Sequence, residues 1–208
     1  MKPAYAAKRL IDVVLGTVLL LLLGPVMLIV ALAILLVDGR PVLFSQVRPG
    51  FRDEPFVCRK FRTMRAPRPG ENRWTTDEVR VSALGRALRR TSLDELPELI
   101  HVVTGRMSLV GPRPLLMEYL PQYNAHHRRR HEMRPGITGL AQVSGRRGLT
   151  LSQRLDLDIE YIDGWTLWGD VRILVRTLAE PFRPGDIPGQ TVADVDDLLF
   201  HATIRGDR

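Results

Sequence analysis

A run of twenty-five uncharged residues, Val13–Val37, constrains this chain more than any other feature. Folded as a helix, it is long enough to cross the hydrocarbon core of a bilayer, which is about 30 Å thick. A signal peptide fits less well, because the run is long and no convincing small-residue cleavage site follows it. The sequence therefore predicts a membrane-attached protein.

Gly24 and Pro25 stand at the middle of this run. Proline removes a backbone donor and clashes with the preceding turn, so we expect the helix to bend here, although transmembrane helices tolerate kinks. Basic residues, which favour the cytoplasmic side of a membrane, flank both ends of the run: Lys2, Lys8, Arg9, Arg40 and Arg48. A re-entrant helix that returns to its own side satisfies both flanks better than a single crossing, which remains the alternative.

Outside this run the chain is basic, with thirty Lys and Arg against twenty-three Asp and Glu, a net charge of +7. That balance favours anionic partners such as lipid headgroups, lipid phosphates and nucleotides. We expect no nucleic acid partner, because the sequence has no recognised binding motif and no regular interleaving of aromatic and basic residues. The single cysteine, Cys58, excludes an internal disulfide and a multi-cysteine metal site.

Several stretches carry a secondary-structure signal. Strands are predicted at Val42–Val47 and Phe56–Arg62, around a turn at residues 48–50. Helical spacing predicts a short basic helix around Leu84 and Leu88, and two packed helices near residues 151–162 and 167–178. The glycine-rich segment Pro135–Gly148 is predicted to be a loop, either one whose backbone lies close to a ligand or an ordinary connection.

The stretch Thr91–Pro114 begins near two adjacent carboxylates, Asp94 and Glu95, and ends in a Gly-Pro-Arg-Pro turn. Ser92 followed by Glu95 is the capping-box pattern of a helix start. Pro97 instead favours a helix that begins at the proline, which would leave both acids just outside it. Either placement puts them at the positive end of a helix dipole, which favours the ionised form that a nucleophile or metal ligand needs. Taken alone, such a pair is more often structural than catalytic.

Three histidines, His126, His127 and His131, lie among arginines, and the last two have the spacing of neighbours on one helical face. We reject a metal site here, because three adjacent arginines disfavour a cation and only Glu132 could add a carboxylate. A basic patch at the membrane interface is the prediction.

Several motifs in order resemble those of the bacterial sugar transferases, and in particular the small monotopic phosphoglycosyl transferases. These motifs are Lys8–Asp12, Lys60–Met64, Ser108–Pro114, Arg134–Gly139 and Asp158–Asp170. The resemblance implies transfer of a phosphosugar from a nucleoside diphosphate sugar, usually a UDP-sugar, to undecaprenyl phosphate or a similar polyprenol phosphate. UMP would be released, in the first membrane step of glycoconjugate or exopolysaccharide assembly. Gly24 departs from the family, which typically has serine before this proline.

The resemblance also implies a role for each of several residues. Asp94 is the expected nucleophile, which forms an aspartyl-phosphosugar intermediate. Glu95 and Asp94 are the expected ligands of Mg²⁺, a cation that binds carboxylate and phosphate oxygens. The other expected roles are substrate phosphate binding by Lys60, Gly111, Pro112 and Arg113, nucleotide or substrate binding by Arg134, Gln142 and Arg146, and the membrane break at Gly24 and Pro25. Judged separately, each is better explained structurally, Arg113 as a turn residue and Lys60 as an exposed strand lysine.

Together these features predict an α+β, mostly helical fold in three parts. Residues 1–40 are expected to form a re-entrant membrane helix-break-helix, and residues 41–184 a small cytosolic catalytic domain with a short β-hairpin and interface helices. Residues 185–208 are expected to form a partly ordered tail. The expected location is the cytosolic face of a bacterial inner membrane.

A second hypothesis comes from a different class: a non-enzymatic, membrane-anchored scaffold whose basic face binds anionic lipids or a partner. The sequence does not select the sugar, and it leaves the oligomeric state open, a homo-oligomer included.

Overall fold

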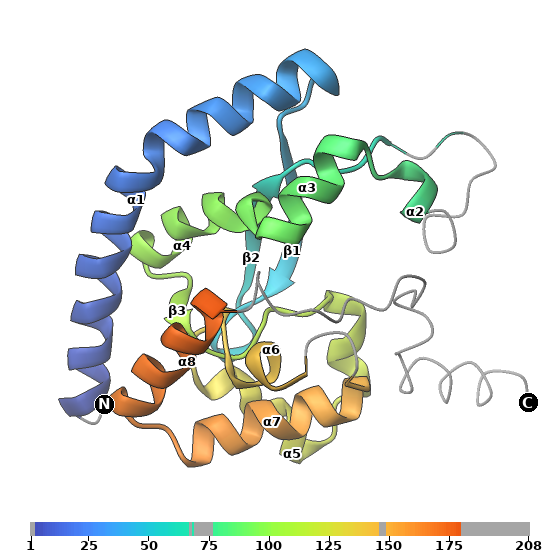
Figure 1. The fold of residues 1–208 in the computed structure, drawn as a ribbon. Coiled ribbons are helices and arrows are strands. Elements are labelled where there is room, and N and C mark those ends of the chain that lie inside the picture. The colour runs from blue at the N-terminus through green and yellow to red at the C-terminus, as the bar shows by residue number, and fades with distance from the viewer. Residues whose placement is uncertain (1–2, 67, 69–76, 146–148, 180–208) are drawn as a thin grey trace, which may run out of the picture. The chain divides into compact units, whose positions relative to one another are not determined.

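The computed structural model describes residues 3–66, 68, 77–145 and 149–179 (Figure 1). The chain divides into two compact units, each built from two stretches of sequence. The first unit comprises residues 1–47 and 57–109, and the second comprises residues 48–56 and 110–208. Arg146 and the expected tail, residues 185–208, lie outside the described residues. The three-part division of the chain stays a prediction.

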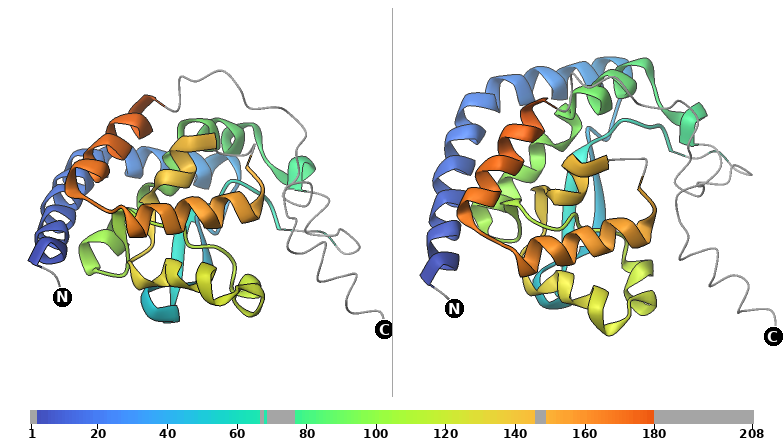
Figure 2. Two further views of the ribbon diagram at one scale, coloured as in Figure 1. Left: turned by 90° about the horizontal axis from the view of Figure 1, so that it is seen from below. Right: turned by 60° about the horizontal axis from the view of Figure 1, so that its bottom comes forward.

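The N-terminal helix α1 (Pro3–Val37) is one uninterrupted helix of 35 residues, with Pro25 inside it. The expected helix-break-helix is thus one helix without an interruption. The bend expected at its middle is present, as Figures 1 and 2 show. A bend relieves the proline clash while the helical hydrogen bonds continue on both sides. By length and composition, α1 could cross a membrane, and only 11% of its most apolar window is buried.

Both halves of α1 pack on the first unit. In the N-terminal half, the Arg9 guanidinium donates to the carbonyl of Val102 at 2.6 Å and to that of Val103 at 2.9 Å. Asp12 is buried and accepts hydrogen bonds from the Ser108 hydroxyl and the Leu109 amide. In the C-terminal half, Val30 and Ile34 pack against Phe61 and Leu88 of the same unit in an apolar core.

A β-hairpin is formed by β1 (Leu43–Pro49) and β2 (Pro55–Phe61), which confirms the predicted pair of strands. The turn comes later than predicted, because the first strand continues through Pro49 and the 3-10 turn η1 (Phe51–Asp53) makes the reversal. The Gly50 amide closes this turn on the Glu54 carbonyl at 2.9 Å. A Cβ at Gly50 would lie 2.8 Å from that carbonyl oxygen, so the position requires glycine.

The other helices described in the first unit are α2 (Asp77–Arg80), α3 (Ala83–Thr91), η2 (Leu93–Glu98) and α4 (Leu99–Thr104). The predicted basic helix around Leu84 and Leu88 is confirmed as α3. Ser82 caps it, because its hydroxyl accepts from the Gly85 amide at 2.9 Å.

The second unit contains the end of β3 (Ser108–Val110), which pairs with β4 (Gly136–Thr138). Its helices are η3 (Met117–Gln122), α5 (Ala125–Arg128), η4 (Arg129–Glu132), α6 (Leu140–Gly145), α7 (Leu151–Asp163) and α8 (Leu167–Ala179). The helices α7 and α8 confirm the predicted pair. An apolar core of Tyr119, Tyr123, Leu151 and Leu155 holds α7 in place.

The prediction of a loop over residues 135–148 is wrong, because this segment contains β4 and α6. Gly136 and Gly139 serve close packing against the backbone of Gly111 rather than loop freedom. The Gly111 amide donates to the Thr138 carbonyl and the Gly136 amide to the Pro112 carbonyl, both at 2.9 Å. A Cβ at Gly136 would lie 2.1 Å from the Gly111 nitrogen.

Candidate active site

Asp94 and Glu95 lie in the 3-10 turn η2, directly before α4. The predicted capping box is wrong. Ser92 has a left-handed backbone with φ of 57°, ends α3, and makes no side-chain cap bond to the described residues. Pro97 lies inside η2, so the acids are outside the α-helix, as the proline alternative predicted.

The Lys60 ammonium lies between two carboxylates of η2. Its Nζ is 2.8 Å from Oε1 of Glu95 and 3.2 Å from Oε1 of Glu98. Lys60 extends from β2, two residues after Cys58, whose Sγ donates to the same Glu98 oxygen at 3.2 Å. Alternation along a strand places Cys58 and Lys60 on one face of β2. The structure therefore brings together two residues that the sequence predicted, Lys60 and Glu95.

Glu98 belongs to this cluster, although the sequence analysis did not select it. Only 1% of Glu98 is exposed, and burial of an ionised carboxylate without a partner is costly. Lys60 supplies the opposite charge and Cys58 a hydrogen bond. The sequence signal was the spacing of three residues between Glu95 and Glu98, which places them near each other on a helical turn.

Asp94 and Glu95, the adjacent acids of η2, are suitable donors for Mg²⁺. This cation takes oxygen ligands, usually one or two carboxylates, and substrate phosphates complete its shell. Among the residues that the structure describes, no group of three or more His, Cys, Asp or Glu side chains could hold a metal ion. Two carboxylates alone fit a magnesium ion whose remaining ligands are substrate phosphates. Because Glu95 contacts Lys60, a metal there would have to share or displace this ammonium.

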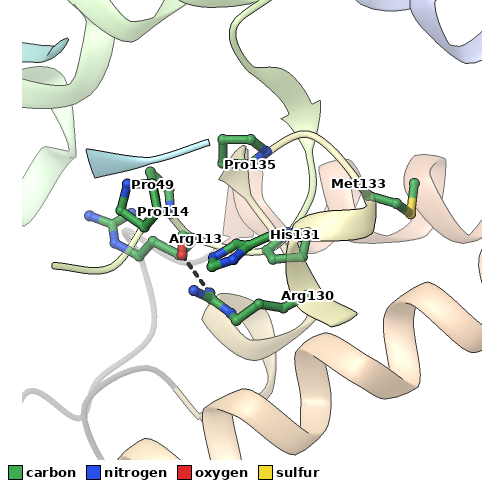
Figure 3. A pocket seen from close by; sticks show the side chains of 8 residues that line it. Pro49, Arg113, Pro114, Arg130, His131, Met133 and Pro135 are labelled. Carbon is green, nitrogen blue, oxygen red and sulfur yellow. Dashed lines mark hydrogen bonds between the residues drawn. The ribbon is translucent and has the colours of Figure 1, made fainter. Parts of the chain in front are cut away.

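Gly111, Pro112 and Arg113 follow β3 in the second unit and lie beside β4, with a bend at Gly111; these three residues are called the Gly111–Arg113 turn below. A Cβ at Gly111 would lie 2.4 Å from the Arg134 carbonyl oxygen, which explains the glycine. The Arg113 carbonyl accepts from Nη2 of Arg130 at 2.6 Å. Figure 3 shows this bond in a small recess whose lining includes Arg113. The full lining is Pro49, Pro112, Arg113, Pro114, Arg130, His131, Met133 and Pro135.

Arg130 holds this turn through a buried ion pair that the sequence analysis missed. Its Nε and Nη2 lie 3.0 Å and 2.6 Å from Oδ2 of Asp158 on α7. Burial raises the pKa of the Asp158 carboxyl, while the adjacent guanidinium opposes this shift. Since Arg130 also binds the Arg113 carbonyl, it positions the backbone of the predicted phosphate-binding residue.

Gln142 and Arg134, predicted for the nucleotide or substrate loop, have different surroundings. Both amide atoms of Gln142, on α6, are buried and have no hydrogen-bond partner within the described part of the chain. Such a group is costly, and a polar ligand or an ordered water would satisfy it. The Arg134 guanidinium lies 5.5 Å from the centre of the Phe51 ring.

The predicted site residues thus fall into two sets. In the first unit, Lys60 and Glu95 are in contact, and Asp94 is adjacent in η2. In the second unit, Gly111, Pro112 and Arg113 form the turn beside β4. A Cβ at Gly139 would lie 2.3 Å from the Gly111 carbonyl oxygen and 2.9 Å from the Gln142 side chain, which places Gln142 next to this turn.

Comparison with known proteins gives one family and several relatives. The model of the family described as bacterial sugar transferase matches residues 3–184. An uncharacterized sugar transferase, EpsL, of Bacillus subtilis (strain 168) is 44% identical over 171 residues, which cover 82% of this chain and 85% of the relative.

Two further relatives carry the name UDP-glucose:undecaprenyl-phosphate glucose-1-phosphate transferase. The protein of Caulobacter vibrioides is 43% identical, over 82% of this chain and 68% of its own length. The protein of Escherichia coli (strain K12) is 42% identical, over 84% of this chain but 40% of its own length. The chain thus spans less than half of the Escherichia coli relative.

Proposed function

The chain is an enzyme of the bacterial sugar transferase family, and from this premise we propose that it transfers a phosphosugar from a UDP-sugar to undecaprenyl phosphate. The names of the two transferase relatives support this donor and acceptor. The observation that carries the proposal is the contact of Lys60 with Glu95, next to Asp94 in η2. It sets a cation beside a pair of carboxylates, as attack on an anionic phosphate requires.

In the proposed first step, a carboxylate oxygen of Asp94 attacks the phosphorus next to the sugar. A P–O bond forms to Asp94, the P–O bond of the diphosphate bridge breaks, and UMP leaves with its electron pair. In the second step, a phosphate oxygen of undecaprenyl phosphate attacks the same phosphorus and releases the Asp94 carboxylate. The product is undecaprenyl diphosphate-sugar.

Other side chains of the chain hold and neutralise the phosphates in this proposal. Lys60 offsets the charge around the η2 carboxylates, and Arg113 binds a substrate phosphate with two parallel N–H groups. Glu95, with Asp94, would hold Mg²⁺, which neutralises phosphate charge when bound. The amide of Gln142 has no hydrogen-bond partner among the described residues, which supports its recognition of the nucleotide or sugar beside the Gly111–Arg113 turn.

We also propose that α1 is re-entrant. Its bend, and the docking of residues near both Arg9 and Ile34 on the same unit, support this topology over a straight crossing, which would carry one end away from the unit. Its exposed face offers large apolar side chains to lipid: Leu10, Val14, Leu21, Leu22, Leu28, Ile29 and Leu36. On the cytosolic face of an inner membrane, the enzyme would reach both a soluble donor and a lipid acceptor.

A panel assay tests the proposal. The purified full chain, in detergent with Mg²⁺ and undecaprenyl phosphate, is incubated with UDP-glucose and other nucleotide sugars, and released UMP is measured. We expect UMP release that depends on donor, acceptor and metal and disappears in Asp94→Asn. Absence of release with every donor, together with binding to anionic vesicles, would favour the scaffold alternative.

A further inference from the structure

His131 has no role in the proposed chemistry, yet its imidazole contacts Asp53, a residue of the η1 turn with an unusual backbone conformation. Nδ1 lies 2.5 Å from Oδ1 of Asp53. Asp53 has φ of 64°, in the left-handed region that non-glycine residues rarely adopt. Its other oxygen accepts from Arg128 at 2.8 Å. A strained backbone that aims a fixed carboxylate at a histidine suggests a functional constraint on the ring.

The second ring nitrogen of His131 is unsatisfied. Nε2 is buried and has no hydrogen-bond partner among the residues described by the structure, and the whole residue is only 7% exposed. His131 lines the same recess as Arg113, and Figure 3 shows its ring beside Arg113 and Arg130. Buried polar atoms are nearly always paired, so this atom calls for a partner that the described part of the chain does not supply.

The contacts of Asp53 determine which partner Nε2 can take. Although burial acts in the opposite direction, hydrogen bonds from Arg128 and His131 hold the pKa of Asp53 below its ordinary value. An ionised carboxylate only accepts, so Nδ1 must carry the proton, and Nε2 of the neutral ring is a hydrogen-bond acceptor.

The ring is neutral near pH 7. Burial first, and then the Arg130 charge, lower the pKa of His131 to about 4. The groups around the ring are Asp53 on η1, Tyr123, Arg128 on α5, Arg130 on η4, and Arg113 in the recess. The charges of Arg130 and Arg128 oppose protonation of the ring, whereas the Asp53 carboxylate favours it.

A phosphate oxygen is a poor partner for this atom, because two acceptors would face each other. A hydroxyl group is suitable, because it donates. In a nucleotide sugar, ring hydroxyls of both the ribose and the transferred sugar lie a few bonds from a phosphate, and Arg113 in the same recess is the proposed phosphate ligand. Since Nε2 is sealed from solvent, the side chains at the rim must move to admit the ligand.

We propose that His131 is a specificity-determining residue: its Nε2 accepts a hydrogen bond from a ring hydroxyl of the nucleotide sugar whose phosphate Arg113 binds, and Asp53 positions the imidazole. This inference rests on the proposed function and adds a residue to its substrate site. The shared chemistry is a hydroxyl close to phosphate, on either the ribose or the sugar.

Two substitutions of His131 separate the functions of its two nitrogens. His131→Asn keeps an N–H near Nδ1 to donate to Asp53 but has no acceptor at the position of Nε2. His131→Gln reaches further and can place an acceptor near Nε2. The full chain carries Asp94→Asn in every sample, so that no donor is consumed, and unfolding temperatures check that each variant folds.

Dissociation constants are measured for UDP-glucose, UDP-2-deoxyglucose, UDP, and the 2′-deoxy and 3′-deoxy forms of UDP. With His131 present, we expect one deoxy analogue to bind at least about tenfold more weakly than its parent, because a site built for a hydroxyl rejects the analogue that lacks it. That ratio should fall close to one in His131→Asn and be partly kept in His131→Gln. Whichever analogue is rejected identifies the ribose or the sugar.

Three results would overturn the inference. An unchanged ratio in His131→Asn would mean that another group reads the hydroxyl. Equal binding of every analogue with His131 present would mean that Nε2 binds only a structural water. This comparison needs no variant of His131, so it tests the inference even if His131→Asn does not fold. No binding of UDP or UDP-glucose at all would instead overturn the proposed function, and this inference with it.

Discussion

Two glutamates share one lysine, and their surroundings give them different tasks. Glu98 is 1% exposed and also accepts from Cys58, whereas the Glu95 side chain retains 18% of its exposure. Lys60 therefore stays with Glu98 as a buried charge pair and reaches Glu95 at the partly exposed side. We expect a substrate or metal that binds at Glu95 to change the contact between Lys60 and Glu95 and to leave the contact between Lys60 and Glu98 intact.

Breaking this pair from one side should destabilise the protein. Lys60→Met leaves Glu98 with no opposite charge and should lower the free energy of unfolding by about 3 kcal/mol, in the range for a buried pair that loses one partner. Adding Glu98→Gln to Lys60→Met removes the stranded charge and should recover most of the loss. Chemical unfolding in detergent measures both; a double variant as unstable as the single one would contradict the pairing.

Arg113→Lys should reduce activity while the protein keeps its fold. A lysine supplies the charge but not the planar pair of donors, so kcat/KM for UMP release should fall about tenfold to a thousandfold. Arg129→Lys is the matched control, because Arg129 pairs with Asp163 at the exposed surface. Activity of Arg113→Lys equal to that of the control would reduce Arg113 to a turn residue.

At the scale of elements, sequence pattern predicted what local spacing determines. The hairpin, the basic helix α3 and the pair α7 and α8 follow from strand alternation and helical periodicity. The two failures have different causes. Ser92 ends α3 instead of capping the next helix, because its amide bonds back to the carbonyls of Leu88 and Arg89. Gly136 packs against the backbone of Gly111 instead of loosening a loop, and a contact between residues this far apart in the chain leaves no local signal.

The bend of α1 gives a prediction about topology. Gly24-Pro25→Leu-Leu restores a donor and removes the proline clash, so α1 should straighten and span the bilayer. Cysteines introduced near residues 2 and 205 are labelled with an impermeant reagent in intact cells, and the native Cys58 is buried. The unmodified protein should show both positions on the same side, and the Leu-Leu variant on opposite sides.

The control is Val13-Val14→Leu-Leu, which changes apolar residues in the same helix without touching its bend. It should label like the unmodified protein. Opposite sides in the unmodified protein would refute the re-entrant helix.

For the whole molecule, the sequence led to the family, because ordered motifs over residues 3–184 are specific together. Of the predicted site residues, the structure brings Lys60 and Glu95 into contact, and the roles of all of them stay predictions. It could not reveal Glu98 as the partner of Lys60, or Asp53 as the partner of His131, since these contacts join residues 38 and 78 positions apart in the chain. Burial and pairing over such distances become visible only in three dimensions. They add the side chains that hold the predicted ones in place.

We expect magnesium to be required for activity and not for the stability of the fold. Removal of divalent cations with EDTA should abolish UMP release while the unfolding temperature changes little, because the described residues form no all-protein metal cage. Added Mg²⁺ should restore activity. Full turnover in EDTA would remove the metal from the proposal.

The covalent role of Asp94 is the central claim, and the intact mass of the protein after incubation with donor alone tests it most directly. With acceptor withheld, the unmodified chain should gain the mass of one phosphosugar and release one equivalent of UMP. Glu95→Gln should gain less, and its yield should rise with added Mg²⁺. Asp94→Asn keeps the size of the side chain but lacks the nucleophile, so it should gain nothing. A phosphosugar on Asp94→Asn, or none on the unmodified protein under any quench, would contradict the account.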